Sequence, residues 1–159
     1  MSPRIHIDLA RQQLVLDLGH RRVVYPVSTS GRGAGERNGS GRTPRGAHVV
    51  RARIGAGVVP GTVFVGRRPT GEICTPELYA EAPERDWILT RILWLSGTEP
   101  GRNRLGDVDT MQRYIYIHGC PDEVALGVPG SHGCIRMRNA DLIELFDRVP
   151  VGTPVLIEE

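Results

Sequence analysis

Residues 4–28 read RIHIDLARQQLVLDLGHRRVVYPVS, and this stretch says most about the fold. Apolar side chains alternate with polar ones in successive short runs, namely Ile5/Ile7/Leu9, Leu14/Leu16/Leu18 and residues 23–27. A period of two places alternate side chains on the same face of a β-strand. Between the second and third runs, Gly19-His20 is a typical turn. The chain is therefore predicted to begin with a β-meander that has one face buried.

Strand-like segments continue through the rest of the chain, at residues 48–54, 61–65, 87–95, 114–117 and 153–157. Apolar side chains at helical spacing mark residues 140–149, with Asn139 as the N-cap and Pro150 as the stop. Residues 76–82 are predicted to form a second, short helix. No repeat or linker divides the chain, so we expect a single domain over residues 1–159. We expect it to be mostly β, a sandwich or partly open barrel with one docked C-terminal helix.

A long polar loop interrupts the predicted strands. Residues 28–46 are rich in Ser, Gly, Arg and Thr and contain almost nothing apolar. Long ordered loops of this kind often carry function. We expect loop 28–46 to lie at the surface, where covering the functional site is one role open to it.

The bulk composition limits the class of partner. The chain has 159 residues, of which 40% are apolar and 24% charged, as in a globular domain that can bury a core. Its net charge is +2, and arginine far outnumbers lysine. This positive charge is too small and too scattered for a nucleic-acid-binding surface. Arginine forms bidentate hydrogen bonds to carboxylates and phosphates, so we expect an anionic substrate instead.

The N-terminus and the cysteines bear on location. Met1 is followed almost at once by the first strand pattern, with no apolar signal core, and no apolar run is long enough to span a membrane. Three cysteines do not make a complete disulfide framework. We therefore expect a cytoplasmic protein, or a periplasmic one if a longer native chain carries an export signal. We expect a monomer with no nucleic-acid partner and no membrane partner.

The candidate reactive group is the thiol in Ser131-His132-Gly133-Cys134. A lone cysteine is usually a buried, inert apolar residue. Here its neighbours are small and polar, and Arg136 and Arg138 follow, so we expect an electropositive loop that lowers the pKa of the thiol. A thiol attacks a carbonyl only as its thiolate, and Cys134 is therefore predicted to be a nucleophile.

Two histidines are candidates to take the proton from this thiol. His118 closes the apolar run 114–117. A histidine at a strand end is more often structural, but paired with Cys134 it becomes the candidate general base. Its other ring nitrogen then needs an acceptor, and the backbone carbonyl of Gly119 is the nominee because the sequence offers no obvious acid. His132 is predicted to assist, to bind substrate or simply to pack, and the sequence does not choose among these.

Further residues near the thiol are candidates for binding. The backbone amides of Gly133 and Cys134 are placed to form an oxyanion hole, although Gly133 alone would also suit a simple turn. Arg136 is predicted to bind a substrate carboxylate, while an exposed, solvated arginine is nearly as common at such a spacing. Ser131 and Tyr116 are also predicted to contact the substrate.

A metal site is the rival interpretation of the same residues. His118-Gly119-Cys120 and His132-Gly133-Cys134 repeat one triplet, and two histidines with two cysteines can hold zinc tetrahedrally. Each His–Cys pair lacks the usual knuckle of about two to four residues, and a closed zinc site would block the thiolate. We therefore predict no metal and no cofactor. A redox switch formed by a Cys120–Cys134 disulfide is an even weaker hypothesis, because a reducing compartment keeps thiols reduced.

At these residues the chain resembles the YkuD family of L,D-transpeptidases, which act on a bond between an L- and a D-centre in peptidoglycan stem peptides. The resemblance covers nearly the whole chain and rests on Ile7–Gln12, Tyr25–Thr29, Thr43-Pro44-Arg45-Gly46, Ile117-His118-Gly119 and Ser131–Met137. It implies a β-rich sandwich with the cysteine in a tunnel beneath a lid. Cys120 departs from the Thr or Ser expected after His-Gly. We therefore expect its side chain near the site, with sensitivity to oxidation as a consequence.

The resemblance also implies a role for each matched position. It makes Cys134 the nucleophile and His118, oriented by the main chain at Gly119, the catalytic histidine. His132 would be a second histidine of the site. The amides of Gly133 and Cys134 would stabilise the oxyanion, and Arg136 would bind a substrate carboxylate.

The implied reaction has more than one outcome. The Cys134 thiolate would attack the bond between the L-centre of meso-diaminopimelate and D-alanine in a tetrapeptide stem, leaving a thioester. Because no export signal is present, we expect water to resolve the thioester, which makes the protein a cytoplasmic L,D-carboxypeptidase that trims recycled muropeptides. The alternatives are a transpeptidase that forms 3→3 cross-links or exchanges D-amino acids, and a non-catalytic zinc- or glycan-binding domain.

Overall fold

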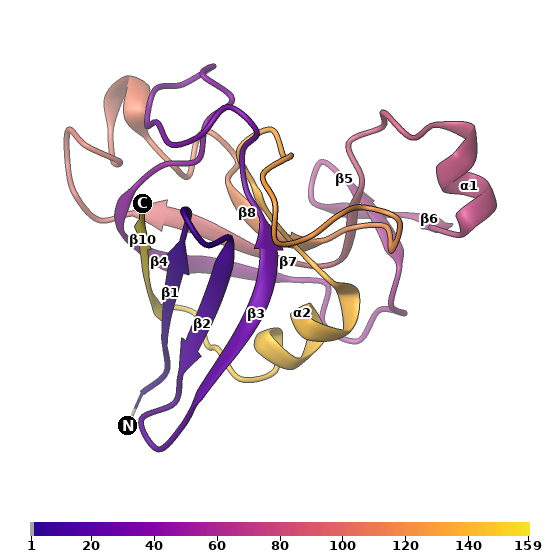
Figure 1. Ribbon diagram of the computed structural model, residues 1–159, viewed down its shortest axis with the longest axis horizontal. Coiled ribbons are helices and arrows are strands. Elements are labelled where there is room, and N and C mark those ends of the chain that lie inside the picture. The colour runs from indigo at the N-terminus through magenta and orange to yellow at the C-terminus, as the bar shows by residue number, and fades with distance from the viewer. Residues whose placement is uncertain (1) are drawn as a thin grey trace.

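The structure is a computed structural model that describes residues 2–159. Figure 1 shows its strands and helices, with both termini on the side of β1 and β10. In chain order the elements are β1 (Arg4–Asp8), β2 (Gln13–Asp17), β3 (Arg22–Ser28), β4 (Gly46–Ile54), β5 (Thr62–Val65), β6 (Arg68–Ile73), α1 (Pro76–Glu81), β7 (Ile88–Gly97), the 3-10 helix η1 (Gly106–Val108), β8 (Tyr116–Gly119), β9 (Ile135–Met137), α2 (Asn139–Phe146) and β10 (Pro154–Glu158). Within residues 2–159, no helix has the length and apolarity needed to cross a membrane.

Strands β4-β10-β1-β2-β3-β9-β8-β7 lie side by side in that order, and β7 returns to pair with β4. This last pairing runs from His48↔Gly97 to Ile54↔Ile92 and closes the sheet into a barrel. The mostly-β class predicted from the sequence is confirmed. Of the two architectures expected, the barrel is the one that forms, and closure leaves these strands no free edge.

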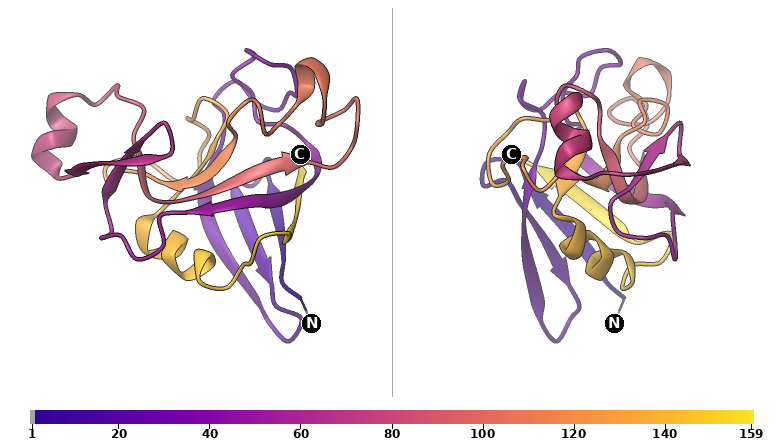
Figure 2. Two further views of the ribbon diagram at one scale, coloured as in Figure 1. Left: turned by 180° about the vertical axis from the view of Figure 1, so that it is seen from behind. Right: turned by 90° about the vertical axis from the view of Figure 1, so that its right-hand side faces the viewer.

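The hairpin β5–β6 lies outside the barrel. β5 pairs with β7 through Val63↔Leu89 and Phe64↔Ile88. Together with α1 it forms a lobe beside the barrel, at the right of Figure 1 and in both views of Figure 2. A small apolar cluster centred on Val63, Trp87 and Leu89 holds this lobe together. The lobe is thus a separate packing unit, attached to the barrel along one strand.

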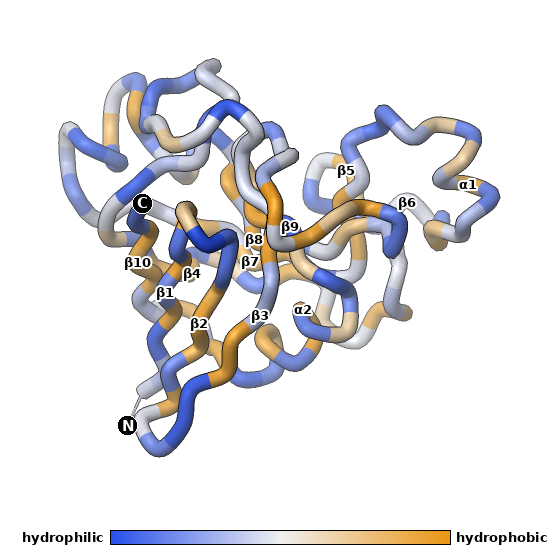
Figure 3. The backbone as a smooth tube through the Cα atoms, viewed as in Figure 1, coloured by the Kyte–Doolittle hydropathy of each residue, from blue (hydrophilic) through white to orange (hydrophobic). Residues whose placement is uncertain are grey.

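The barrel interior holds the main core. The alternation predicted for residues 4–28 is confirmed, and Figure 3 shows apolar and polar stretches following one another along β1, β2 and β3. This core includes Ile5, Ile7, Leu14, Leu16, Leu93, Leu95, Ile117, Ile135, Met137, Leu142, Leu145 and Phe146. Three of them come from α2, which the sequence correctly predicted as the docked C-terminal helix. Each fully buried side chain of this size contributes about 1.5–3 kcal/mol.

Asn139 is not the N-cap of α2, contrary to the sequence prediction. The N-cap is Arg138, which makes no side-chain capping hydrogen bond. The Asn139 side chain instead accepts a hydrogen bond from Thr90 Oγ1 at 2.6 Å and donates one to the Cys120 carbonyl at 3.2 Å. These contacts tie the start of α2 to β7 and to the end of β8. Tertiary hydrogen bonds therefore replace the local cap.

The strand predicted at residues 114–117 is displaced along the chain. Tyr114 has φ = +57°, outside the β region, and β8 begins at Tyr116. As a result, His118 lies within β8 instead of following it. This shift matters for the site, because the residues before and after His118 are both paired with β9. Ile117 pairs with Ile135, and Gly119 pairs with Met137.

Candidate active site

One cavity of about 380 Å³ contains both the predicted nucleophile and the predicted base. Its walls come from the tip of the β5–β6 hairpin, the start of β7, the segment before and within β8, and the segment that leads into β9. The lining residues are Gly66, Arg67, Asp86, Ile88, Arg113, Tyr114, Ile115, Tyr116, His118, Ser131, His132, Cys134 and Arg136. Parallel pairing of β8 with β9 brings the two predicted sequence motifs together at this cavity.

Cys134 is half-buried and lies directly before β9. Its Sγ accepts a hydrogen bond from the Tyr116 amide at 3.3 Å and donates one to the Tyr114 carbonyl at 3.3 Å. Burial raises the pKa of the thiol to about 12, and the nearby charge of Arg136 offsets this only in part. The expectation of a lowered pKa is therefore wrong, because desolvation of the thiolate outweighs the arginine charges. Cys134 rests as a neutral thiol whose proton points to Tyr114.

His118 is 1% exposed and held in one orientation. Its Nδ1 donates a hydrogen bond to the Gly119 carbonyl at 2.7 Å, the acceptor that the sequence argument nominated. In a neutral ring with its hydrogen on Nδ1, the other nitrogen Nε2 carries a lone pair. Within residues 2–159 no hydrogen bond to Nε2 is found. Burial lowers the pKa of His118, so the ring is neutral near neutral pH and able to accept a proton.

Gly119 is required for this geometry by its close neighbours. A β-carbon at this position would lie 2.7 Å from the Leu89 carbonyl oxygen and would also collide with the Asn139 side chain. Strand β8 therefore approaches β7 and the start of α2 more closely than any other residue would allow. The carbonyl that orients His118 is held in place by this packing.

The turn before β9 is fixed by the Ser131 side chain. The hydroxyl donates to the Cys134 carbonyl at 2.6 Å and accepts from the Gly133 amide at 3.2 Å. Ser131 thus lines the cavity, but both hydrogen bonds of its hydroxyl are made within the turn. Its contact with substrate stays a prediction. The Gly133 amide, one of the two predicted oxyanion donors, is already hydrogen-bonded. For the Cys134 amide no partner is found in the part of the chain that the structure describes.

Three arginines make the cavity positive. Arg136, predicted from the sequence, faces His118 across the β8–β9 pair and donates to the Gly130 carbonyl at 3.2 Å. Arg67, from the hairpin tip, donates to the Tyr116 hydroxyl at 3.1 Å and lies over the Tyr114 ring at 4.9 Å. Arg113 completes the set, and Asp86 is the one acid among the lining residues. Such a cavity favours an anionic ligand.

Comparison with known proteins agrees with this arrangement. The family model YkuD, described as the L,D-transpeptidase catalytic domain, matches residues 2–157. The chain belongs to this family. A 43-residue segment, 27% of this chain and 14% of the relative, is 49% identical to the probable L,D-transpeptidase YbiS of Escherichia coli K12. A 45-residue segment, 28% of this chain and 15% of the relative, is 51% identical to the probable L,D-transpeptidase ErfK/SrfK of Salmonella typhimurium.

Solved L,D-transpeptidase structures share the fold. L,D-transpeptidase 3 from Mycobacterium tuberculosis, in complex with a faropenem-derived adduct, superposes with a TM-score of 0.60 at 15% identity, over 99% of this chain and 60% of that one. The L,D-transpeptidase from Xylanimonas cellulosilytica gives 0.56 at 21% identity, over 99% and 60% of the two chains. The chain spans about 60% of these solved chains, and the matched segments span a small part of the curated relatives. At these identities the likeness establishes the fold.

The remaining predicted residues of the YkuD motif also line the cavity. His132 is exposed there, and Tyr116 is buried with its hydroxyl held by Arg67. The sequence did not predict Arg67, Arg113 and Asp86 as site residues. Arg67 and Asp86 lie far from the motifs in the chain, and Arg113, directly before the predicted strand 114–117, belongs to neither motif. A positive φ of 66° at Arg67 marks the hairpin tip, but no sequence signal placed this tip at the cavity.

Loop 28–46 does not cover the cavity, which was the role left open for it. None of its residues lines the cavity. The loop packs instead behind the turn before β9: Ser131 and Gly31 donate to the Thr29 and Ser131 carbonyls at 2.8 and 3.0 Å. The residues that lean over the cavity come from the β5–β6 hairpin. Loop 28–46 supports the catalytic turn from its buried side.

The rival zinc interpretation finds no support in the geometry. Among residues 2–159, no three His, Cys, Asp or Glu side chains are grouped so that they could share a metal ion. Cys120 is 2% exposed and donates to the Met137 carbonyl at 3.3 Å. It follows Gly119, whose carbonyl binds His118, but it does not line the cavity. Burial raises the pKa of its thiol to about 11. What separates Cys120 from Cys134 is that only Cys134 lines the cavity.

Proposed function

We propose that this YkuD-family protein is a cysteine-dependent acyl-transfer enzyme that cleaves the bond between the L-centre and the terminal D-alanine of peptidoglycan tetrapeptide stems. One observation carries the proposal. Cys134 and His118 line a single cavity, and the Gly119 carbonyl fixes the His118 ring so that Nε2 is the nitrogen left without a partner. A thiol and a neutral imidazole in this state are the two groups that acyl transfer needs.

In the first step, His118 Nε2 takes the proton of Cys134 as Sγ attacks the carbonyl carbon. Because the free thiol is neutral, proton transfer accompanies attack instead of preceding it. The oxyanion is bound by a backbone amide of the turn. When the carbon–nitrogen bond breaks, the His118 imidazolium returns the proton to the departing amine of D-alanine, and a thioester remains on Cys134. His132 assists at the exposed rim.

The substrate class follows from the charge of the cavity. A stem ending in D-alanine carries its terminal carboxylate beside the scissile bond, and meso-diaminopimelate carries another at the far end of its side chain. Arg136, Arg67 and Arg113 offer guanidinium groups suited to carboxylates. In this proposal Arg136 binds the carboxylate next to the reacting bond, with Tyr116 and Ser131 beside it, and Arg67 holds the more distant one.

For the second step we propose hydrolysis, with His118 taking a proton from water as it attacks the thioester and Cys134 leaving as a thiol. The cytoplasmic setting proposed below would offer few acceptor stems, which leaves water as the acceptor. The product is a tripeptide stem, and the activity is that of an L,D-carboxypeptidase. Membership of a family described by transpeptidation favours the second candidate, in which an amine of another stem or a D-amino acid resolves the thioester.

A cytoplasmic role on recycled muropeptides, as a monomer, completes the proposal. The three cysteines are free thiols, a state that suits a reducing compartment. Fractionation of cells that produce the full native chain tests the location, and sedimentation tests the monomer.

The decisive experiment incubates a disaccharide tetrapeptide with the wild-type protein and with Cys134→Ala, with and without a D-amino acid acceptor. Mass spectrometry of the products is the readout. We expect tripeptide and free D-alanine from the wild-type protein even with acceptor present, and nothing from the variant. Exchanged or dimeric products would establish transpeptidation instead. Turnover by Cys134→Ala would refute the cysteine mechanism.

A further inference from the structure

Thr43 links loop 28–46 to the catalytic turn through one hydrogen bond. The residue is 1% exposed and does not line the cavity. Its hydroxyl accepts the Ser30 amide at 3.0 Å and donates to the Gly133 carbonyl at 2.9 Å. The Ser30 N–H is a donor, so the Thr43 hydroxyl oxygen accepts from it. The single hydroxyl hydrogen is then left to donate to the Gly133 carbonyl. The contact is therefore fixed in direction.

This contact orients the peptide group that joins Gly133 to Cys134. The carbonyl and the N–H of one planar trans peptide point in opposite directions. Thr43 holds the Gly133 carbonyl on the buried side, among residues that do not line the cavity. The Cys134 N–H consequently points away from Thr43. Since Ser131 already occupies the Gly133 amide, the Cys134 N–H is the donor of the turn left for an oxyanion.

Gly133 needs such a restraint because of its own conformation. Its φ is +130°, and a β-carbon there would lie 3.3 Å from both the Arg42 carbonyl and Ile115 Cδ1. A glycine is thus required, but glycine also leaves the adjoining peptide plane free to rotate. The Thr43 hydroxyl selects one orientation of that plane.

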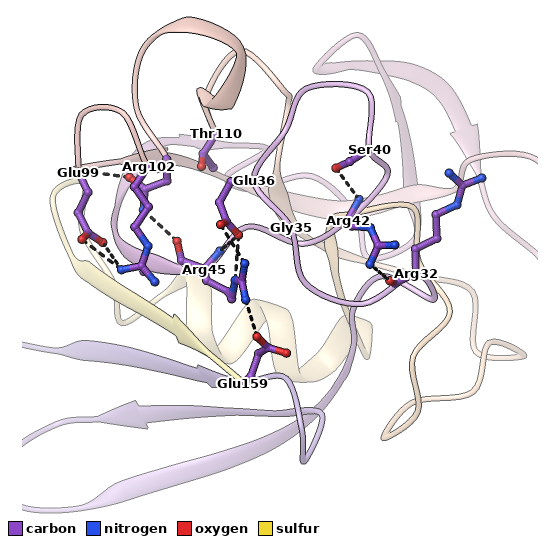
Figure 4. Close-up of polar contacts among 12 residues, drawn as sticks. Arg32, Gly35, Glu36, Ser40, Arg42, Arg45, Glu99, Arg102, Thr110 and Glu159 are labelled. Carbon is purple, nitrogen blue, oxygen red and sulfur yellow. Dashed lines mark hydrogen bonds and ion pairs between the residues drawn. The ribbon is translucent and has the colours of Figure 1, made fainter.

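Loop 28–46 is built to keep Thr43 in place. The Thr43 backbone is paired on both sides, accepting from Gly35 at 2.9 Å and donating to Gly33 at 3.1 Å. Figure 4 shows polar contacts of this loop, in which Glu36 pairs with Arg45 at 3.0 Å. From the cavity wall, Arg113 donates to the Gly35 carbonyl at 3.1 Å. The loop therefore holds Thr43 in place independently of its contact with Gly133.

We propose that Thr43 is a positioning residue for acyl transfer, which aims the Cys134 amide at the oxyanion by holding the Gly133 carbonyl. The inference rests on the proposed function only in requiring that Cys134 be acylated, whatever the natural substrate. In the step concerned, a bond forms between Cys134 Sγ and an acyl carbon, the leaving group departs, and the thiol proton passes to His118. Thr43 touches none of these atoms and acts through the backbone.

The test compares two reactions of the same thiol in Thr43→Val. Acylation by p-nitrophenyl acetate passes through an oxyanion, whereas alkylation by iodoacetamide displaces iodide and forms none. We expect the valine variant to acylate about 10- to 100-fold more slowly, since a single oxyanion donor is worth roughly 100- to 1,000-fold. The alkylation rate at the same pH stays within about twofold, because the thiol and His118 are untouched. Rates are read from nitrophenolate release and from the intact mass, with the modified residue mapped to Cys134.

Two variants control for structure. Thr43→Ser keeps the hydroxyl and restores acylation. Thr153→Val removes another buried threonine hydroxyl, which donates to the Pro150 carbonyl at 2.7 Å away from the cavity, and leaves both rates unchanged. If Thr43→Val does not fold, Thr43→Ala set against Thr43→Ser makes the same comparison.

Unchanged acylation in Thr43→Val would overturn the inference, and so would a parallel fall in both reactions that serine does not restore. Failure of the proposed function is distinguishable from these results. Wild-type protein that acylates with the ester but never processes a tetrapeptide would refute the substrate and leave the role of Thr43 standing.

Discussion

Two regions of the barrel each bury a histidine, and they use it in opposite ways. Near the start of β4, His48 is 2% exposed, and both ring nitrogens are hydrogen-bonded, Nδ1 to the Gly46 carbonyl at 3.0 Å and Nε2 to Thr110 Oγ1 at 2.9 Å. In β8, His118 is 1% exposed, and among residues 2–159 only its Nδ1 has a hydrogen-bond partner. Burial lowers the pKa of both rings, that of His48 to about 4. The two therefore differ in a single nitrogen.

This difference separates a structural histidine from the proposed general base. Burial and a lowered pKa are common to both, so neither property marks the active site. The unbonded Nε2 does, because a nitrogen without a partner beside a cavity is available to a substrate proton. His48 supports the site indirectly. Its bond to Thr110 anchors the segment that continues to Arg113 and Tyr114 in the cavity wall.

The largest expected effect comes from the thiol that lines the cavity, compared with a buried thiol outside it. Cys134→Ala removes the nucleophile, and we expect acyl transfer to fall by at least about 10⁴-fold. Cys120→Ala, a buried cysteine outside the cavity, should retain activity and lose only stability. Steady-state turnover of a tetrapeptide stem, together with thermal melts, measures both. Comparable losses of activity in the two variants would contradict the assignment.

Matched His→Asn substitutions test the comparison itself. Asparagine can keep the bond made by Nδ1 but has nothing at Nε2. His118→Asn should lose about 10²- to 10⁴-fold in acyl transfer, the usual contribution of a general base, with little loss of stability. His48→Asn should keep its activity per folded molecule and lose about 1–3 kcal/mol, because Thr110 is left without its partner. Kinetics and denaturant unfolding measure activity and stability of both variants. A loss of stability in His118→Asn together with a loss of activity in His48→Asn would contradict the comparison.

The pH dependence of alkylation tests the resting state of the cavity thiol. Since the pKa of Cys134 is raised to about 12, we expect the iodoacetamide rate to rise about tenfold per pH unit from 7 to 9, about 100-fold in all. Mass spectrometry of the peptide that contains Cys134 follows the reaction. A rate that levels off near pH 7 would show a thiolate stabilised in the free protein and would restore the expectation drawn from the sequence.

The acid side of the stability curve tests the structural histidine. His48 has a lower pKa in the folded protein, about 4, than the ordinary value of 6.5, so the unfolded chain binds protons first as the pH falls. Its contribution is present above pH 6.5 and is lost as the pH falls toward 4. The loss amounts to roughly 3 kcal/mol. Denaturant unfolding of wild type and His48→Asn at several pH values measures it, and equal slopes for the two proteins in this window would contradict the prediction.

The smallest effect concerns the opposite wall of the cavity. Arg67→Met keeps an apolar stem over Trp94 and Tyr114 but removes the guanidinium and its bond to the Tyr116 hydroxyl. We expect KM for a stem peptide to rise about tenfold with little change in kcat, because a charge that binds substrate equally in ground and transition states affects binding alone. Iodoacetamide alkylation of Cys134 serves as the control. A fall in kcat with KM unchanged would place Arg67 in the chemistry.

Much of the fold was predictable because local patterns agree with it. Period-two alternation in residues 4–28 and the apolar stripe of residues 140–149 each describe an element that buries one face, and both formed as predicted. The predicted start of the C-terminal helix was wrong, because the Asn139 side chain does not cap the helix and instead contacts Thr90 and Cys120. Closure of the barrel through β4 and β7 was also beyond sequence patterns, because nothing local encodes which distant strands pair.

The candidate site divides in the same way. The sequence alone determined the chemical groups, since Cys134, His118, His132 and Arg136 lie in two motifs whose residue types suit one chemistry. Only the tertiary structure decided their state. It buried Cys134 so that its pKa rises, bonded one nitrogen of His118 without, within residues 2–159, bonding the other, and brought Arg67 and Asp86 to the cavity from distant segments. The physical reason is that desolvation, hydrogen-bond partners and nearby charge depend on what surrounds a residue in space, which its sequence neighbours do not determine.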